Sequence, residues 1–344
     1  MKGTSVSVTL TRSMMRYAVS RGARLEDLCA AVGIEPSLLR LPDERISGDQ
    51  SLKAWNAAVE ATGDTDFGLH LGELSQPAQL GLVGFAMISA SDLGGAMERL
   101  VRYTNLLTDG VRGTITREGT LARLQLEPTR GVANFLHQSP RQHIECTLSA
   151  FLALTAALTG RPLPVTEVWF RHPEPANTQE HLRIFRAPVH FGREANRVTF
   201  LADALGWPLV DSNPGLLAAF DARAVGAVRR LDQAAPWSER VGSAIMENLQ
   251  GTVPTLEHVA RGLGVSGRLL QRRLLAEGTS FRRLLDQARH ELSLHHLRRD
   301  EVPVAEISYL LGFAEPSVFH RSFRRWTGST PANVRRRFRG PGTT

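Results

Sequence analysis

The stretch Thr255-Leu-Glu-His-Val-Ala-Arg-Gly-Leu-Gly-Val-Ser266, followed by Leu270-Gln-Arg-Arg-Leu274, has the pattern of two short helices joined by a tight turn. The first helix has a small residue, Ala260, where the two helices must approach closely, and the turn contains Gly264, which readily adopts a positive φ. This combination predicts a helix-turn-helix, a motif whose second helix can lie in the major groove of DNA.

The pattern occurs a second time in residues 304–323, with Ser308 at the small position and Gly312 in the turn. Up to the turn, each position lies 48 residues after its counterpart in the first copy, and beyond the turn the offset is 49. Between the copies, residues 281–298 have apolar side chains at helical spacing and predict one long helix. At 1.5 Å per residue this helix would be roughly 27 Å long. It is therefore long enough to hold two recognition helices in successive major grooves.

The net positive charge of the chain lies entirely in the segment with this doubled motif. Residues 236–344 contain 17 Arg and no Lys against 10 Asp and Glu, so they carry the whole formal charge of +7. The acidic and basic side chains of residues 1–235 balance. Electrostatics therefore predicts a polyanionic partner, double-stranded DNA, for the C-terminal part only.

Polar side chains lie on the outer face of each predicted recognition helix. If Leu270 and Leu274 face inward, helical periodicity directs a row of polar residues outward. Arginine suits bidentate recognition of guanine, and glutamine suits adenine. The same register in the second copy places Arg321 at the position of Arg272. The candidate DNA-binding residues are Arg268, Gln271, Arg272, Ser317, His320, Arg321 and Arg324.

The chain is expected to fold as two domains. Residues 1–232 predict an α+β effector-binding or regulatory domain, and residues 238–338 an all-α domain of two helix-turn-helix motifs joined by a long helix. Residues 233–237 are the expected linker, with Ser238 able to cap a following helix, and residues 339–344 the expected disordered tail. In the first domain, periodicity predicts helices over 9–20, 25–32, 49–62, 92–108, 140–159 and 213–231, and strands over 111–117, 121–126, 165–171, 189–191 and 197–201.

No sequence pattern of an enzyme or a metal site is found. The chain lacks a nucleophile elbow, a P-loop, a dinucleotide-binding glycine pattern and a zinc-protease motif. His137, His143 and Glu145 suggest a metal cluster at first, but residues 143 and 145 are two apart on a predicted helix and point in different directions. Cys29 and Cys146 are too few for a zinc site. We therefore expect no enzymatic activity, cofactor or metal.

The chain also lacks the patterns of a membrane or exported protein. It has no run of 18 apolar residues, and its N-terminus has no basic region followed by an apolar run and a cleavage site. These observations predict a cytoplasmic protein without a membrane partner.

The C-terminal part closely resembles the DNA-binding domain of the AraC/XylS family of bacterial transcription regulators. The stretches quoted above carry the resemblance, together with Ile307-Ser-Tyr-Leu-Leu-Gly-Phe313 and Phe319-His-Arg-Ser-Phe-Arg-Arg-Trp-Thr-Gly-Ser-Thr-Pro331. The resemblance implies two recognition helices in adjacent major grooves, an activator of transcription and RNA polymerase as a partner. Pro316 departs from the polar residue common in the family, which puts base reading at that position in doubt.

The N-terminal part resembles, less specifically, the arabinose-binding-like domain of one subgroup of this family. The matching stretches are Gly81-Leu-Val-Gly-Phe-Ala-Met-Ile-Ser-Ala-Ser-Asp-Leu93, Phe185-Arg-Ala-Pro-Val-His-Phe-Gly192 and Asn196-Arg-Val-Thr-Phe200. The resemblance implies a small-molecule effector, which need not be arabinose. The alternative is a domain that serves only oligomerisation, such as homodimer formation, or binding of a protein partner. Candidate effector-binding residues are Phe67, His70, Phe85, Met87, Tyr103, His137, Trp169 and Phe170.

Overall fold

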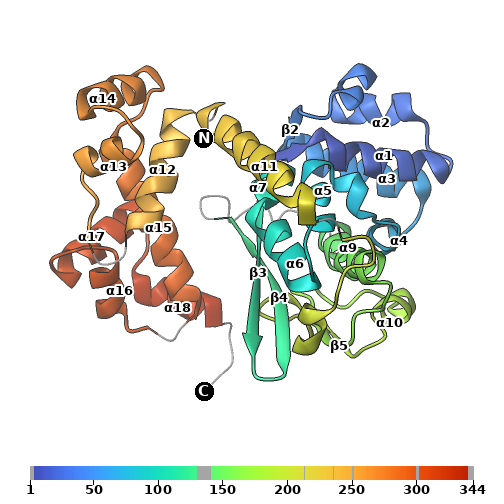
Figure 1. The fold of residues 1–344 in the computed structure, drawn as a ribbon. Coiled ribbons are helices and arrows are strands. Elements are labelled where there is room, and N and C mark those ends of the chain that lie inside the picture. The colour runs from blue at the N-terminus through green and yellow to red at the C-terminus, as the bar shows by residue number, and fades with distance from the viewer. Residues whose placement is uncertain are drawn as a thin grey trace. The chain divides into compact units, whose positions relative to one another are not determined.

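The computed structural model describes residues 4–129, 141–212, 214–234, 236–249, 252–299 and 302–339. The chain divides into two compact units, an N-terminal unit of residues 2–231 and a C-terminal unit from residue 232 onward. The first unit contains both strands and helices, whereas the second contains helices and no strand in its described residues (Figure 1). The predicted fold class, α+β followed by all-α, is confirmed. No helix in the described ranges is long and apolar enough to cross a membrane.

A five-stranded sheet forms the β part of the N-terminal unit. Its central hairpin pairs β3 (Val111–Glu118) with β4 (Leu121–Pro128) in antiparallel register, as the alternating sequence predicts. The inward face of β4 consists of Ala122, Leu124 and Leu126, all of them buried. The sheet continues in the order β3, β4, β7 (Asn196–Leu201), β5 (Val165–Trp169) and β6 (Val189–His190), with only β6 running parallel to its neighbour. A small second sheet pairs β1 (Ser5–Ser7) with β2 (Arg45–Ser47).

Helices pack closely around this sheet. Gly68 and Gly72 are required where α4 lies against α9, because an added Cβ would lie 2.0 Å from the carbonyl oxygen of Gln142 or 2.5 Å from that of Cys146. The helices of the unit are α1 (Val8–Ser20), α2 (Leu25–Val32), α3 (Gly48–Thr62), α4 (Phe67–Glu73), α5 (Leu82–Ile88), α6 (Leu93–Arg102), α7 (Thr104–Leu107), α9 (Arg141–Thr159), α10 (Gln179–Phe185) and α11 (Pro214–Ala234), with 3-10 turns η1 (Pro36–Arg40), η2 (Pro77–Leu80) and η3 (Ala202–Gly206).

The predicted elements differ from the observed ones in several respects. The single helix expected over residues 92–108 is two helices, α6 and α7, because Tyr103 leaves the helical conformation at φ −107° and ψ 12°. The helices α4, α5 and α10 have only seven residues each and were not predicted. So short a segment shows too few turns for its apolar spacing to be distinguished from that of a loop.

The C-terminal unit consists of helices around one apolar cluster. Val241, Leu274, Leu292 and Phe319, which come from four different helices, belong to this cluster and are buried. The helices are α12 (Trp237–Asn248), α13 (Leu256–Gly262), α14 (Gly267–Ala276), α15 (Phe281–Arg299), α16 (Val304–Leu310), α17 (Pro316–Thr327) and α18 (Pro331–Arg339). The long helix expected over residues 281–298 is thus confirmed.

Helices reach into both ends of the segment expected to be a linker, residues 233–237. Helix α11 continues to Ala234 and α12 already begins at Trp237, with Pro236 rather than Ser238 at its N-cap position. The first backbone N–H groups of α12, those of Trp237 and Ser238, donate to the carboxylate of Glu277 at 2.7 and 2.8 Å. A carboxylate from α14 thus replaces the local cap that the sequence suggested. Of the expected tail, Arg339 is the last residue of α18, and residues 340–344 lie outside the described ranges.

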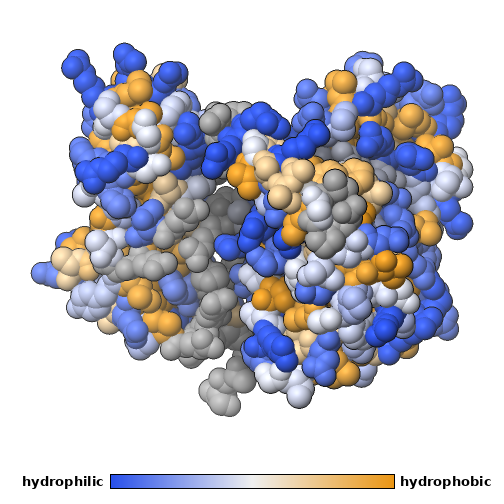
Figure 2. All heavy atoms as spheres, viewed as in Figure 1, coloured by the Kyte–Doolittle hydropathy of each residue, from blue (hydrophilic) through white to orange (hydrophobic). Residues whose placement is uncertain are grey.

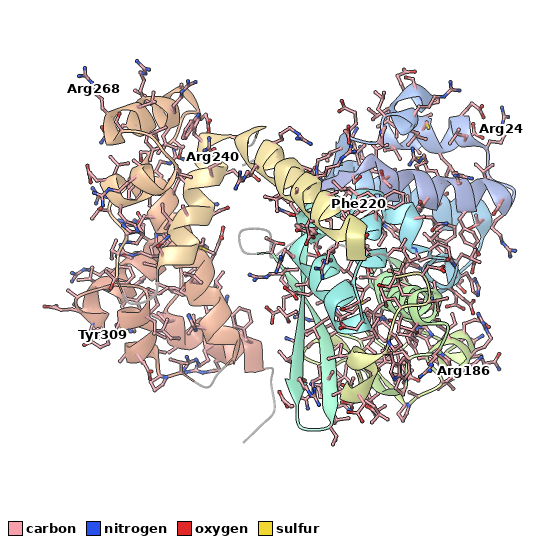
Figure 3. The ribbon with its side chains drawn as sticks, in the orientation of Figure 1. Arg24, Arg186, Phe220, Arg240, Arg268 and Tyr309 are labelled. Atoms are coloured by element: carbon pink, nitrogen blue, oxygen red, sulfur yellow. The ribbon has the colours of Figure 1, made fainter. Side chains whose placement is uncertain are left out.

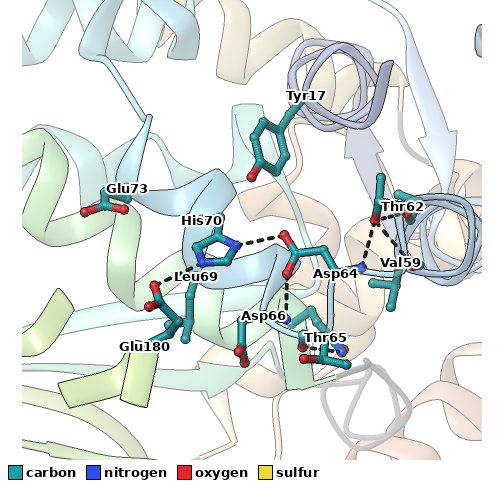
Figure 4. A network of polar contacts seen from close by, with 12 residues as sticks. Tyr17, Val59, Thr62, Asp64, Thr65, Asp66, Leu69, His70, Glu73 and Glu180 are labelled. Carbon is teal, nitrogen blue, oxygen red and sulfur yellow. Dashed lines mark hydrogen bonds and ion pairs between the residues drawn. The ribbon is translucent and has the colours of Figure 1, made fainter. Parts of the chain in front are cut away.

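His70 links two of the short helices that the sequence did not predict. Its Nδ1 lies 2.7 Å from Asp64 Oδ2 and its Nε2 lies 3.0 Å from Glu180 Oε2 (Figure 4). Both contacts are hydrogen bonds only when the imidazole is protonated, because a neutral ring has one N–H. Burial by itself would lower the pKa of His70, but the two carboxylates raise it above the ordinary value. The charged form of His70 therefore holds α10 against α4.

The stabilisation by His70 should weaken as the pH rises. Because its pKa is raised in the folded chain, the stabilisation is fully present below the unfolded value of about 6.5 and is lost as the pH passes through the raised value. His70→Gln should therefore lower the melting temperature most at about pH 5.5 and progressively less toward about pH 9. Thermal unfolding across this range measures the difference, with His258→Gln on the exposed surface of α13 as the control. A difference that stays constant or grows with pH would contradict the assignment.

Candidate nucleic-acid interface and effector-binding residues

Helices α13 and α14 form the first helix-turn-helix. Thr255 and Ser266 begin the two helices, and the side-chain oxygen of each accepts a hydrogen bond from a backbone N–H of the first turn. Gly264 in the turn has a φ of 71°, in the left-handed region that glycine adopts without strain. Leu270 and Leu274 are buried, so the predicted inward face of α14 is confirmed.

Helices α16 and α17 repeat this arrangement. Gly312 in the turn has a φ of 69°, and Ser308 is completely buried at the close approach of the helices. Phe319 and Phe323 form the inward face of α17. Pro316 is the first residue of α17, a position where its fixed φ and missing N–H favour the start of a helix. Pro316, which departs from the polar residue common in the family, therefore has a structural role at the start of α17.

Helix α15 connects both motifs, and Arg289 orients the second one. Its guanidinium donates to the carbonyl oxygens of Leu311 and Gly312, each at 3.0 Å, and lies 4.3 Å from the centre of the Phe313 ring. These groups belong to the turn between α16 and α17. Arg289 is only partly exposed, because it binds this turn. The sequence offers one sign of this role: Arg289 lies one helical turn before Leu292, on a side of α15 that is otherwise apolar.

The outer faces of α14 and α17 are exposed and polar. All seven predicted DNA-binding residues lie on these two faces, and each is exposed. Arg268 extends away from the body of the unit in Figure 3, and hydrophilic side chains surround α14 in Figure 2. Leu275 lies on the same face as Arg272 and is 75% exposed, so α14 also presents an apolar group. Such a face offers donors for base edges and phosphates together with a contact for a thymine methyl group.

Four predicted effector-binding residues are completely buried and fill the core of the N-terminal unit. Phe67 packs against the rings of Tyr17 and Trp55, with centroid distances of 5.0 and 6.1 Å. Phe170 packs against Phe185 and Phe191 at 5.8 and 5.7 Å. The four residues are Phe67, Met87, Tyr103 and Phe170. For Phe67 and Phe170, these packing contacts account for their positions.

The other predicted effector-binding residues lie apart from one another. His70 binds two carboxylates as described above. Trp169 lies in β5, and the guanidinium groups of Arg193 and Arg197 lie 5.3 and 3.3 Å from the centre of its ring. His137 lies outside the described residues. Among the described residues, none of these candidates lines the cavity at the end of α9.

Phe85 and Tyr103 both contact α11, the helix that leads to the C-terminal unit. Phe85 is 44% exposed and stacks on Phe220 of α11, with a centroid distance of 5.4 Å. The Tyr103 hydroxyl donates to the carboxylate of Asp221 at 3.1 Å, and Arg99 pairs with the same carboxylate at 3.5 Å. These contacts anchor α11 on the N-terminal unit.

The residues considered as a metal cluster contact separate groups. His143 packs against Trp55, and its burial lowers its pKa to about 4. Glu145 is completely buried and pairs with His181 at 2.8 Å and with Arg141. Within the described ranges, no three histidine, cysteine or acidic side chains are arranged to hold a metal ion.

The chain matches known regulators in both of its parts. Residues 22–209 match the family model described as the arabinose-binding domain of AraC transcription regulator, and residues 259–337 match a helix-turn-helix domain. The chain is 26% identical over 332 residues to the ornithine utilization regulator of Pseudomonas aeruginosa, covering 96% of each protein. It is 30% identical over 337 residues to an uncharacterized HTH-type transcriptional regulator of Mycobacterium tuberculosis, again covering 96% of each.

A solved structure is similar over most of the chain. The crystal structure of the transcriptional regulator CdpR from Pseudomonas aeruginosa covers 90% of this chain and 96% of its own, with 24% identity and a TM-score of 0.40. The first family model covers more than half of the chain, and the second covers both recognition helices. The chain therefore belongs to the AraC family of DNA-binding transcription regulators, in the group with an arabinose-binding-like N-terminal domain.

Proposed function

We propose that this regulator responds to a small-molecule effector and activates transcription in the cytoplasm, binding its site with α14 and α17 in adjacent major grooves and contacting RNA polymerase. One observation supports the proposal that α14 and α17 bind DNA in adjacent major grooves. The outer faces of α14 and α17 are exposed and polar, and they belong to one unit whose apolar cluster includes α15. That unit also carries the excess positive charge of the chain.

The effector response rests on the family of the N-terminal domain and on the anchoring of α11. An effector that changes the contacts of α11 would change the start of α12, because only residues 235 and 236 separate the two helices. Linkage then requires that DNA also changes the affinity for the effector. The filled core around Phe67 and Phe170 favours a second candidate function for this domain, oligomerisation without a ligand.

DNA binding should depend strongly on salt and should reside in the C-terminal unit. Each phosphate neutralised by an arginine contributes about −0.9 to the slope of log K against log salt concentration. A fragment of residues 232–344 should therefore bind duplex DNA with a steep salt dependence, and a fragment of residues 1–231 should not bind. Fluorescence anisotropy over a salt series measures both. Equal binding by the two fragments at moderate salt would contradict the assignment.

Arg272 and Arg321 should read bases in different half-sites. Replacing either by alanine should weaken binding to the specific site by about 1–3 kcal/mol and relax base preference locally. Footprints and selection of binding sequences should place the two effects about one helical turn of DNA apart. Arg229→Ala, which removes an exposed arginine of α11, is the control for the change in charge. Two effects within the same half-site would contradict the two-groove arrangement.

Arg289 should matter for binding of the full site although it lies away from the outer faces. Lysine cannot donate to two carbonyl oxygens with the fixed fork of a guanidinium, so Arg289→Lys should loosen the second motif. Loss of about one charge-assisted hydrogen bond predicts roughly tenfold weaker binding to the full site, with contacts to the first half-site retained. Arg282→Lys, an exposed position of the same helix, is the control. Unchanged affinity and an unchanged footprint would show that Arg289 does not orient α17.

A further inference from the structure

A cavity of about 200 Å³ lies at one end of α9, away from the aromatic core. Its buried lining consists of Pro77, Leu158 and Leu209, and the partly buried Ile88 completes the apolar wall. Gln76, Ala157 and Asp211 also line it and are exposed, so they form its rim. The cavity is smaller than the roughly 300–1,000 Å³ of pockets for drug-sized ligands. It therefore admits only a compact molecule.

The rim of this cavity is electronegative. Asp211 lines it, is exposed and, within the described residues, forms no ion pair with an arginine, lysine or histidine. Ala157 and Leu158 belong to the last turn of α9, where the carbonyl groups give a helix a partial negative charge. The nearby Arg161 is directed to another group, since its guanidinium lies 5.6 Å from the centre of the Trp207 ring. The combination of an apolar wall and a negative rim favours a cation with a short apolar body.

We propose that this cavity is the effector site of the N-terminal unit and that it takes a compact primary amine, with the ammonium group at Asp211 and the carbon chain against Ile88, Leu158 and Leu209. The proposal rests on the proposed function, because it names the class of effector and its site. None of the lining residues is among the candidates that the sequence suggested.

The cavity is placed so that a bound amine acts on the segment that precedes α11. Leu209 and Asp211 belong to that segment. It is held to the cavity wall by Val210, whose N–H donates to Leu158 O at 2.9 Å, and by Ser212, whose hydroxyl donates to Ala90 O at 2.7 Å. An ammonium group at Asp211 would draw this segment toward the end of α9. Binding of an amine in the cavity would thereby change the position of α11 on the N-terminal unit.

The test uses the full chain and four small probes of similar size: 1,4-diaminobutane, n-butylamine, butanoate and 1-butanol. Thermal unfolding and calorimetric titration should show saturable binding of the two amines and none of butanoate or butanol. Asp211→Asn should weaken amine binding about tenfold or more, because it removes the charge-assisted bond. Ala157→Phe should abolish binding by filling the mouth of the cavity. Asp43→Asn, a change at an exposed aspartate elsewhere, should leave amine binding unchanged.

Two results would overturn the proposal. The first is the absence of amine binding to the wild-type chain, or equal binding of butanoate, and the second is undiminished amine binding by Asp211→Asn. Measuring DNA affinity with each probe separates this proposal from the proposed function. If a metabolite of another class changes DNA affinity while the amines do not bind, the effector response stands and this site is wrong. If the amines bind at Asp211 but no ligand changes DNA affinity, the amine-binding site stands, whereas the effector response and the role of this cavity as an effector site are wrong.

Discussion

The arrangement of α14 and α17 depends on the burial of one side of α15 among the other helices of the C-terminal unit. Ala288, Leu292 and Leu297 place this helix in the same apolar cluster as Leu274 of α14 and Phe319 of α17. Apolar contacts are non-directional, so they hold the helices together without fixing their rotation. Arg289 supplies direction, because its planar guanidinium must face two carbonyl oxygens of the second turn at once.

The two units use charged groups in different ways. In the C-terminal unit most arginines remain on exposed faces, and the seven predicted DNA-binding residues are free of the apolar cluster. In the N-terminal unit charged groups pair with one another, as in the contacts of His70 with Asp64 and Glu180 and of Arg183 with Glu73. The first arrangement leaves positive charge for phosphates, and the second fastens short helices that have little apolar surface of their own.

Helix α11 is the last helix of the N-terminal unit before α12. Phe220 and Asp221 fasten it to Phe85, Tyr103 and Arg99 of the N-terminal unit, and α12 begins two residues after it ends. A helix transmits a displacement along its length, whereas a flexible linker would not. Within the expected linker, residues 233 and 234 belong to α11 and Trp237 belongs to α12.

The sequence by itself determined the elements whose signals are local. Spacing of apolar residues, turn glycines and capping side chains placed both helix-turn-helix motifs, the helix α15 and the hairpin of β3 and β4 within a few residues. The tertiary structure decided what depends on distant partners. The cap of α12 by Glu277, the contact of Arg289 with a turn more than 20 residues away and the burial of Phe67 and Phe170 join residues that no local period relates. An aromatic residue of the core and one of a binding site have the same sequence signal, because both are apolar and only their three-dimensional neighbours distinguish them.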